Sequence, residues 1–332
     1  MKNKLLLLLL FFSLHVFLKA QVDPHFSQYY VYPSWLNPAL TGAIDGDYRV
    51  SSIFRKQWNS IDGFSTTGLS ADINSNQSIN IGVSLLQQKA GVGGYTFLNS
   101  NISVAYTGIK FDAAGLKRLV FAMQGGILDR RFDRSKFTLG DQWNPITGYN
   151  PSATSADIIK TNASTVFDMG VGFLYYDASP FKTANLYVGF SASHLTQPED
   201  PFTNGMVHSK LPIRYTFHGG VKCRINNQLS VVPNILYLNQ GNATEKMVGA
   251  YVQIKGNNFF DFLTGINYRV DDAFAIFIGA NYKNITAGIS YDFVTSALGK
   301  NINNINSIEL SLSYIFRKPK SLPSVEFVCP RL

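Results

Sequence analysis

The feature that most constrains the fold of this chain is an alternation of apolar and polar side chains that recurs along most of its length. In residues 307–314 the even positions are apolar and the odd positions are polar. Successive side chains of a β-strand point to opposite faces, so this pattern predicts strands with one apolar and one polar face. The polar face is rich in Gly, Ser, Thr and Asn. Outer-membrane strands have this character, because one face meets lipid and the other a wet lumen.

About fourteen segments alternate in this way, and bacterial single-chain barrels have an even number of strands. The segments lie near 47–58, 64–74, 78–88, 96–108, 116–127, 165–177, 182–194, 211–223, 227–238, 244–255, 258–269, 273–282, 285–294 and 306–317. The sequence therefore predicts an all-β fold, a transmembrane antiparallel β-barrel over residues 47–317.

The connections between these segments sort by length. If the first segment runs outward, the three longest connections, 128–164, 195–210 and 295–305, all follow odd-numbered segments. Those after even-numbered segments are short, and the longest of them is about 109–115. Long extracellular loops and short periplasmic turns are the rule for outer-membrane barrels, so this sorting favours the same fold.

The first twenty residues have the layout of a signal peptide that is cut near Ala20. Lys2 and Lys4 precede the apolar run 5–12, which is shorter than the roughly 20 residues of a spanning helix. Beyond it, no stretch is apolar enough for such a helix, so we expect either a soluble protein or a β-barrel. Only 15% of the residues are charged, against about a quarter in a typical soluble domain, and this favours the barrel in the outer membrane.

Residues 21–46 and 318–332 fall outside the alternation. The first stretch contains Pro24, Pro33 and Pro38, which oppose a regular strand. We expect it to form a plug in the lumen or a periplasmic segment, and the second stretch to form a periplasmic tail. The candidate plug or docking residues are His25, Phe26, Tyr29, Tyr30, Trp35, Asn37 and Pro38.

Charged and polar residues on the inner face predict a polar network in the lumen. Its candidate members are Arg214, His218, Lys222, Asp261, Arg269 and Glu309. The two cysteines, Cys223 and Cys329, would both lie at the periplasmic side, where oxidising conditions permit a disulfide. Against that bond, the alternation points Cys223 toward lipid.

No pattern in the sequence indicates catalysis or cofactor chemistry. There is no Gly-x-Ser-x-Gly nucleophile elbow, no phosphate-binding loop and no cluster with metal-ligand spacing. The net charge of +8 is scattered, without the basic and aromatic run that indicates nucleic-acid binding. We therefore expect no enzyme activity, no cofactor, no metal and no nucleic-acid partner. A barrel hydrolase that depends on His194 is the disfavoured alternative.

Several motifs resemble those of the PorP/SprF family of type IX secretion system membrane proteins. The first is the stretch from Asp23 to Tyr30, DPHFSQYY, which is followed by Asn37-Pro38-Ala39. Further motifs in the same order are Gly140-Asp141-Gln142-Trp143, His194 with Gln197 and Pro198, Arg214 with His218, Tyr268-Arg269 and Glu309-Leu310-Ser311-Leu312. The matches span nearly the whole chain after the signal peptide.

The resemblance implies an outer-membrane barrel of the secretion and gliding machinery of Bacteroidota. Its implied partners are outer-membrane lipid, a secreted adhesin with a C-terminal sorting domain, and periplasmic machinery and peptidoglycan-binding components. Candidate contacts in the extracellular loops are Asp141, Gln142, Trp143, His194, Gln197 and Pro198. The alternative function is a passive porin or hydrophobic-substrate channel, which needs an open lumen.

Overall fold

The computed structural model describes residues 23–317 in part. The residues outside the description are 1–22, 59–62, 76, 92–93, 134–135, 137–138, 151, 154–160, 181, 200–209, 258, 297–305 and 318–332. The expected signal peptide, the expected C-terminal tail and Cys329 therefore lie outside the described residues.

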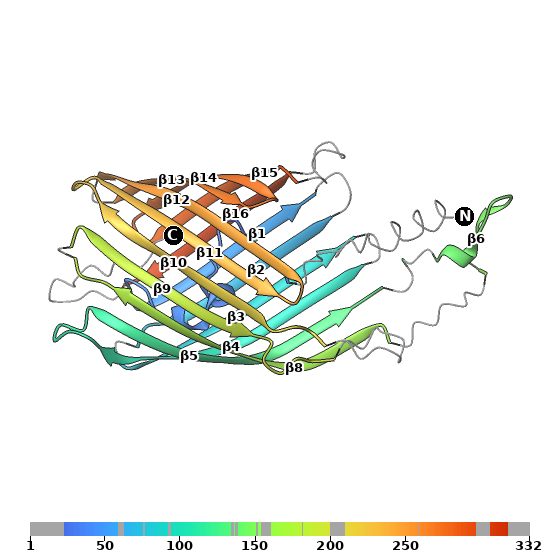
Figure 1. Ribbon diagram of the computed structural model, residues 1–332, viewed down its shortest axis with the longest axis horizontal. Coiled ribbons are helices and arrows are strands. Elements are labelled where there is room, and N and C mark those ends of the chain that lie inside the picture. Colours follow the sequence, from blue (N-terminus) through green and yellow to red (C-terminus); the bar gives the residue numbers. More distant parts are fainter. Residues whose placement is uncertain are drawn as a thin grey trace, which may run out of the picture.

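Fourteen strands close into one antiparallel β-barrel (Figure 1), which confirms the predicted fold class. The barrel strands are β1 (Tyr48–Gln57), β2 (Phe64–Ile73), β3 (Ile79–Ala90), β4 (Tyr95–Lys110), β5 (Lys117–Arg131), β8 (Ala163–Asp177), β9 (Ala184–Ser193), β10 (Arg214–Arg224), β11 (Leu229–Gln240), β12 (Ala243–Asn257), β13 (Phe260–Arg269), β14 (Ala273–Tyr282), β15 (Ile285–Val294) and β16 (Ser307–Phe316). Strands pair in chain order, with β5 beside β8, and β1 closes against β16. Closure leaves the barrel without a free edge.

The strands turn an apolar face outward and a polar face inward. On β16 the side chains of Leu310 and Leu312 are 47% and 52% exposed, whereas Glu309 and Ser313 are 0% and 1% exposed. An apolar outer surface around a polar interior is what a barrel in a lipid bilayer requires.

The two ends of the barrel differ in their connections. The long-loop end, where β1 finishes at Gln57, carries the connections β5–β8, β9–β10 and β15–β16. Within the first of these, η4 (Gly140–Gln142) precedes a hairpin of β6 (Trp143–Asn144) and β7 (Gly148–Tyr149) that stands away from the barrel (Figure 1). The short-turn end is the opposite one, where β1 begins. From the rule for outer-membrane barrels, we expect the long-loop end to face the exterior.

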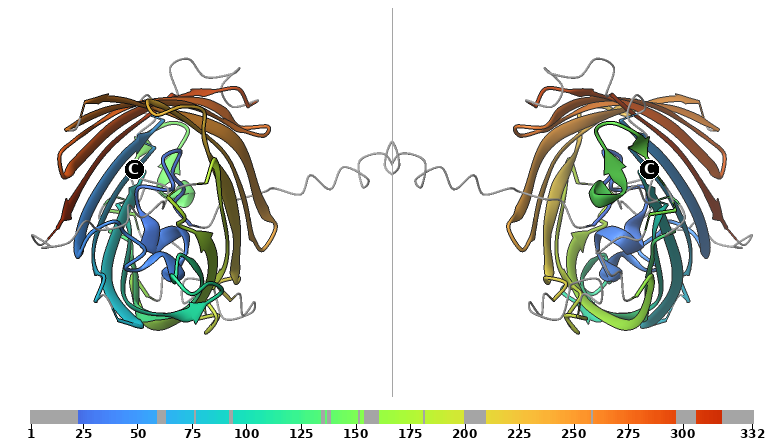
Figure 2. Two further views of the ribbon diagram at one scale, coloured as in Figure 1. Left: turned by 90° about the vertical axis from the view of Figure 1, so that its left-hand side faces the viewer. Right: turned by 90° about the vertical axis from the view of Figure 1, so that its right-hand side faces the viewer.

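Residues 23–46, the inner segment, lie inside the barrel, where Figure 2 shows them in blue within the ring of strands. The short helices α2 (Pro33–Leu36) and η1 (Pro38–Leu40) each open on a proline, whose fixed φ suits a first helical turn. The side chain of Asn37 caps η1 by accepting a hydrogen bond from the N–H of Ala39 at 2.9 Å. No helix among the described residues is long and apolar enough to cross a membrane.

Aromatic side chains of the inner segment build a core inside the barrel. The ring of Phe26 packs edge-on against Tyr32 and Trp35, with centroids 5.9 Å and 5.3 Å away. Tyr30 packs against Tyr251 of β12 at 5.6 Å. Such ring pairs add about 0.5–1.5 kcal/mol each beyond the area that they bury, so the inner segment is packed against the wall as well as hydrogen-bonded to it.

Candidate functional site

The inner segment crosses the lumen from one end to the other. At its start, Asp23 contacts His194, directly after β9, and Arg214, the first residue of β10. Near its finish, Arg317 donates from Nε to the main-chain oxygen of Asp45 at 2.9 Å, just after β16. The chain therefore starts at the long-loop end and reaches the short-turn end, where it continues into β1.

Four buried ionisable side chains, Asp23, Asp168, His194 and Arg214, form what we call the rim cluster. Nδ1 of His194 lies 2.7 Å from Oδ2 of Asp168, and its Nε2 lies 2.7 Å from Oδ2 of Asp23. Nη1 of Arg214 donates to the same Asp23 oxygen at 2.9 Å. This cluster fixes the first described residue of the chain to three wall positions at the long-loop end.

The geometry of the rim cluster defines its charge state. His194 faces a carboxylate with each ring nitrogen, and only the imidazolium form carries a proton on both. Burial alone would lower the pKa of His194, but the charge of Asp23 and the hydrogen bonds to Asp168 and Asp23 raise it to about 9. The imidazolium and the guanidinium of Arg214 then balance the two carboxylates, which is the condition for burying such a group.

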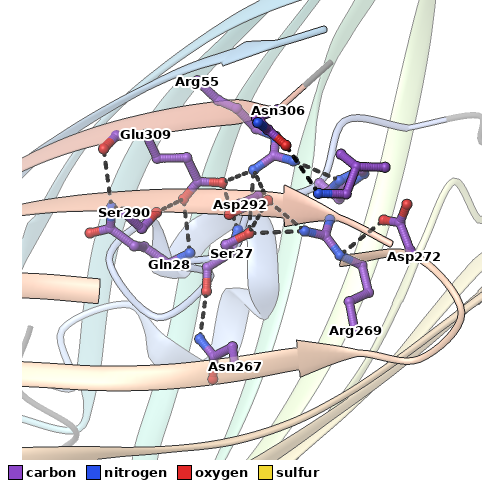
Figure 3. Close-up of polar contacts among 12 residues, drawn as sticks. Ser27, Gln28, Arg55, Asn267, Arg269, Asp272, Ser290, Asp292, Asn306 and Glu309 are labelled. Atoms are coloured by element: carbon purple, nitrogen blue, oxygen red, sulfur yellow. Dashed lines mark hydrogen bonds and ion pairs between the residues drawn. The ribbon is translucent and has the colours of Figure 1, made fainter. Parts of the chain in front are cut away.

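A second cluster, the wall cluster, joins the inner segment to the closing seam of the barrel (Figure 3). It contains Ser27, Arg55, Arg269, Asp292 and Glu309. Arg55 of β1 and Glu309 of β16 are direct cross-strand partners and form an ion pair. Oδ2 of Asp292 accepts from Nη1 of Arg55 at 2.9 Å and from Nη2 of Arg269 at 2.7 Å. Nε of Arg269 also lies 3.2 Å from Oδ2 of Asp272, so two arginines face three carboxylates here.

The wall cluster holds the inner segment through its main chain. The N–H groups of Ser27 and Gln28 donate to the two carboxylate oxygens of Glu309, at 2.6 Å and 2.9 Å. The hydroxyl of Ser27 donates to Asp292 at 2.7 Å. The amide of Asn267 on β13 donates to the carbonyl of Ser27 at 2.9 Å. A buried stretch without strand partners therefore has its main-chain groups satisfied by wall side chains.

Asn37 anchors the middle of the inner segment. Its Nδ2 donates to the carbonyl oxygens of Phe173 and Phe190, at 2.9 Å and 3.3 Å. These two residues are register partners on β8 and β9. The same nitrogen lies 3.1 Å from Nε2 of His218. The amide thus sits directly against the backbone of the wall.

Two glycines permit this close approach. A Cβ atom at Gly172 would lie 2.1 Å from Oδ1 of Asn37, and one at Gly189 would lie 2.2 Å from Nε2 of His218. Both distances are far below van der Waals contact, so only glycine fits at these wall positions.

A third ionic contact lies toward the short-turn end. Arg49 of β1 donates from Nε and Nη2 to the two oxygens of Asp72 on β2, both at 2.9 Å. The same Nη2 donates to the carbonyl of Leu40 at 3.1 Å, and the N–H of Gly42 donates to Asp72 at 2.7 Å. A bidentate arginine–carboxylate pair fixes both partners in one geometry, so it holds the end of the inner segment against the wall.

The residues predicted as plug or docking anchors are all buried inside the barrel. They are His25, Phe26, Tyr29, Tyr30, Trp35, Asn37 and Pro38. Tyr29 donates from its hydroxyl to Asn234 on β11 at 2.7 Å, and the ring of Trp35 lies 4.9 Å from the guanidinium of Arg214. Their contacts are with the barrel wall, and a role in docking a partner stays a prediction.

The six residues predicted to form one lumen network are also buried, but within the described structure they divide among separate places. Arg269 and Glu309 belong to the wall cluster, and Arg214 to the rim cluster. His218 lies beside Asn37, Lys222 is 9% exposed, and Asp261 accepts from Gln253 at 2.7 Å. The reason is spacing, because residues four apart on one strand are about 13 Å apart.

The β5–β8 connection holds three of the predicted loop contacts: Asp141 and Gln142 in η4, and Trp143 in β6. Asp141 is exposed, and Trp143 is 59% exposed. Gln142 instead supports the hairpin, because its Nε2 donates to the carbonyl of Ala153 at 2.8 Å. Ile146 at the hairpin tip is 93% exposed and was not among the predicted contacts.

His194 is a correction to the predicted loop contacts. Its side chain is 1% exposed, because the backbone turns at φ +61° directly after β9 and aims the ring into the lumen. The neighbouring Gln197 is exposed, and Pro198 is half-buried, with its carbonyl accepting from the N–H of Leu211 at 2.9 Å. His194 therefore belongs to the rim cluster, where it contacts Asp23 and Asp168 and no outside partner is needed.

Cys223 is half-buried and is a free thiol among the described residues. Its strand places it on the same face as Phe217, which is 38% exposed on the outside of the barrel. The suggested disulfide partner, Cys329, lies outside the described residues, so the pairing stays a prediction.

A small polar cavity lies between the inner segment and strands β3, β4 and β5. Its volume is about 20 Å³. Five residues that line it each carry a buried polar atom without a partner among the described residues: Asp23 Oδ1, Ser34 Oγ, Trp35 Nε1, Gln124 Oε1 and Arg214 Nε. A polar cavity of this size has room for one ordered water molecule.

Sequence reasoning missed several residues that hold the inner segment. They are Asp23, Ser27, Arg49, Arg55, Asp72, Asp168 and Asp292. Arg55 and Asp292 carried a usable signal, since a charged residue on the inner face of a barrel strand needs a buried partner. The alternation located them inside, but it does not say which partner each one meets.

A closed barrel with an apolar outer face and a polar lumen that contains its own N-terminal residues defines the class: an outer-membrane β-barrel. The family model described as type IX secretion system membrane protein PorP/SprF matches residues 18–314. The chain belongs to this family, as the sequence motifs indicated. Comparison with curated proteins finds no match.

Solved structures of outer-membrane channels have a similar fold. The CymD monoaromatic hydrocarbon channel is 11% identical, with a TM-score of 0.49 over 87% of this chain and 93% of that one. The Pseudomonas putida toluene transporter TodX is 10% identical, with a TM-score of 0.49 over 84% and 91%. The Ralstonia pickettii toluene transporter TbuX is 9% identical, with a TM-score of 0.46 over 85% and 92%. Likeness at this level does not bear on function.

Proposed function

We propose that this protein is a non-enzymatic outer-membrane component of the type IX secretion machinery that supports the secretion or surface anchoring of a partner adhesin. The observation that carries the proposal is the family match over residues 18–314. In this proposal the inner segment is a built-in plug, and the loops at the long-loop end meet the secreted partner. Periplasmic components of the machinery meet the short-turn end.

The contacts of the inner segment oppose the alternative of a passive porin or hydrophobic-substrate channel. The segment is hydrogen-bonded to β16 through Glu309, to β13 through Asn267 and to β8 through Phe173. An open conduit needs these contacts to be absent or broken. In planar bilayers we therefore expect no stable conductance from the intact protein, and a large open conductance would favour the porin.

The hairpin of β6 and β7 is the proposed partner contact. It stands away from the barrel, at the end with the long loops (Figure 1). The side chains of Trp143 and Ile146 are 59% and 93% exposed on it. Aromatic and aliphatic side chains of this kind are typical anchors of a protein–protein contact.

The test is surface display of the adhesin on intact cells. Deleting the gene should abolish display, and the wild-type gene should restore it. A variant with Trp143→Ser and Ile146→Ser should restore the barrel but display the adhesin at least several-fold less. Normal display in the deletion strain would contradict the proposal.

The matched control is Ile225→Ser, which removes an apolar residue that is 61% exposed in a short turn at the opposite end. It should display the adhesin at the wild-type level. The amount of folded barrel in the outer membrane is measured for each variant, so that a loss of display is separated from a loss of the protein.

A further inference from the structure

The direction in which the inner segment runs determines where the preceding chain must go. Asp23 lies at the long-loop end, 2.7 Å from His194, which directly follows the last residue of β9. Its N–H also donates to the side chain of Gln240, the last residue of β11, at 3.2 Å. Both β9 and β11 end at the long-loop end, so two strand ends give the same position for Asp23.

The rest of the inner segment confirms this direction by its contacts. Asn37 lies near the middle of the wall, against Phe173 and Phe190. Asp47 lies at the short-turn end, where its N–H donates to the carbonyl of Phe316, the last residue of β16, at 2.9 Å. From Asp23 to Asp47 the chain thus passes once through the whole barrel.

We infer that the chain N-terminal to Asp23 is displayed on the cell exterior, beside the long loops. Export through the inner membrane delivers the chain to the periplasm, which is the side of the short-turn end. The barrel must therefore close around a segment whose N-terminal end passes through to the far side. The described residues 23–46 form no β-strand and pass through the lumen.

In this arrangement, the chain before Asp23 is part of the extracellular surface of the protein. Asp23 lies at the same end of the barrel as the hairpin of β6 and β7, and the rim cluster attaches it to the wall. A ligand that binds the chain directly before Asp23 from outside would act on Asp23, and through Asp23 on the inner segment. If the chain began on the periplasmic side, an extracellular ligand could not reach it.

The experiment places single cysteines and labels them on intact cells with a membrane-impermeant maleimide. The background carries Cys223→Ser and Cys329→Ser, and the test variant adds Val22→Cys. Thr147→Cys in the hairpin turn marks the long-loop end, and Asn226→Cys in the turn between β10 and β11 marks the short-turn end. Each variant is first checked for the shifted gel migration of a folded barrel.

The expected result is that Val22→Cys and Thr147→Cys label on intact cells, and that Asn226→Cys labels only after the outer membrane is permeabilised. Labelling of Val22→Cys only after permeabilisation would overturn the inference, as would the reverse pattern for the two markers. A peptide tag placed directly before Asp23 and detected with an antibody on intact cells gives a second readout with the same two outcomes. Neither readout depends on the adhesin, so this inference and the proposed function can fail separately.

Discussion

The side-chain amide of Asn37 donates to the main-chain carbonyl of Phe173, which lies 2.9 Å away and 136 residues later in the sequence. Tyr32 makes a related contact, since its hydroxyl donates to the carbonyl of Leu85 on β3 at 3.0 Å. A strand carbonyl has a second lone pair beside the one used in the ladder, so it can accept both bonds. Side chains of the inner segment therefore bind the wall partly through the main-chain carbonyls of the wall strands.

The glycine beneath Asn37 gives a first prediction. Gly172→Ala would place a Cβ atom 2.1 Å from Oδ1 of Asn37, so the inner segment must shift. We expect the free energy of unfolding to fall by about 1–3 kcal/mol, the usual cost of overpacking. The control is Gly125→Ala, where the nearest atom lies 3.4 Å away, in ordinary contact.

The same site allows a rescue experiment. Adding Asn37→Ala to Gly172→Ala removes the clashing atom, so the double variant should unfold closer to Asn37→Ala than additivity predicts. Purely additive effects of the two substitutions in urea titrations would show that the glycine does not act through Asn37.

The wall cluster gives a second prediction. Glu309→Gln keeps the shape but removes the charge that faces Arg55 and that accepts the N–H groups of Ser27 and Gln28. Removing one partner of a buried ion pair costs about 3–5 kcal/mol. The thermal midpoint, followed by the gel shift between folded and unfolded barrel, should fall markedly.

The control for this substitution is Asp271→Asn, in an exposed turn where the residue has a φ of +61° that asparagine also tolerates. Its midpoint should match that of the wild type. An equal effect of the two substitutions would argue against a special role of the buried carboxylate.

The rim cluster predicts a pH dependence. The folded-state pKa of His194, about 9, is above the unfolded value of about 6.5. Its stabilisation is therefore complete below pH ~6.5 and is lost as the pH rises through ~9, with a total on the order of 3 kcal/mol. His194→Gln should lack this loss, so the difference in unfolding midpoint between the two proteins should shrink from pH 6 to pH 10. A constant difference would contradict the imidazolium bridge.

The polar cavity gives a further prediction, in which the direction of the change in stability shows whether the cavity contains water. If ordered water links Gln124 to Asp23 and Arg214, then Gln124→Leu removes one of its partners and should lower the free energy of unfolding by about 1 kcal/mol. If the cavity is dry, the substitution removes an unpaired buried acceptor and the variant should be as stable as the wild type or more stable. Urea titration of the two proteins distinguishes the signs.

The barrel wall was predictable from the sequence because the alternation is a local property. The predicted ranges 273–282 and 285–294 coincide with β14 and β15. The predicted range 211–223 starts earlier than β10, which begins at Arg214, because Pro212 lacks the N–H that a ladder needs. The sorting of loop lengths also identified the two ends before any pairing was known.

The contacts inside the lumen were not predictable, because they depend on closure. Arg55 faces Glu309 only through the register of β1 against β16, which are the first and last strands. His194 was predicted as an extracellular contact at the end of the segment 182–194, because alternation does not reveal that its backbone turns inward after β9. The hairpin of β6 and β7 is too short for an alternation to show.

The contact between Ser27 and Glu309 joins residues that are 282 positions apart, and it has a consequence for synthesis. A chain that stops before β16 lacks both this carboxylate and the strand that closes against β1. Ser27 and Gln28 then lack the carboxylate that accepts from their N–H groups, and the wall around them is not closed. The inner segment can therefore reach its final position only after the whole chain has been made, and in an unfinished barrel its aromatic side chains lack part of the wall that buries them.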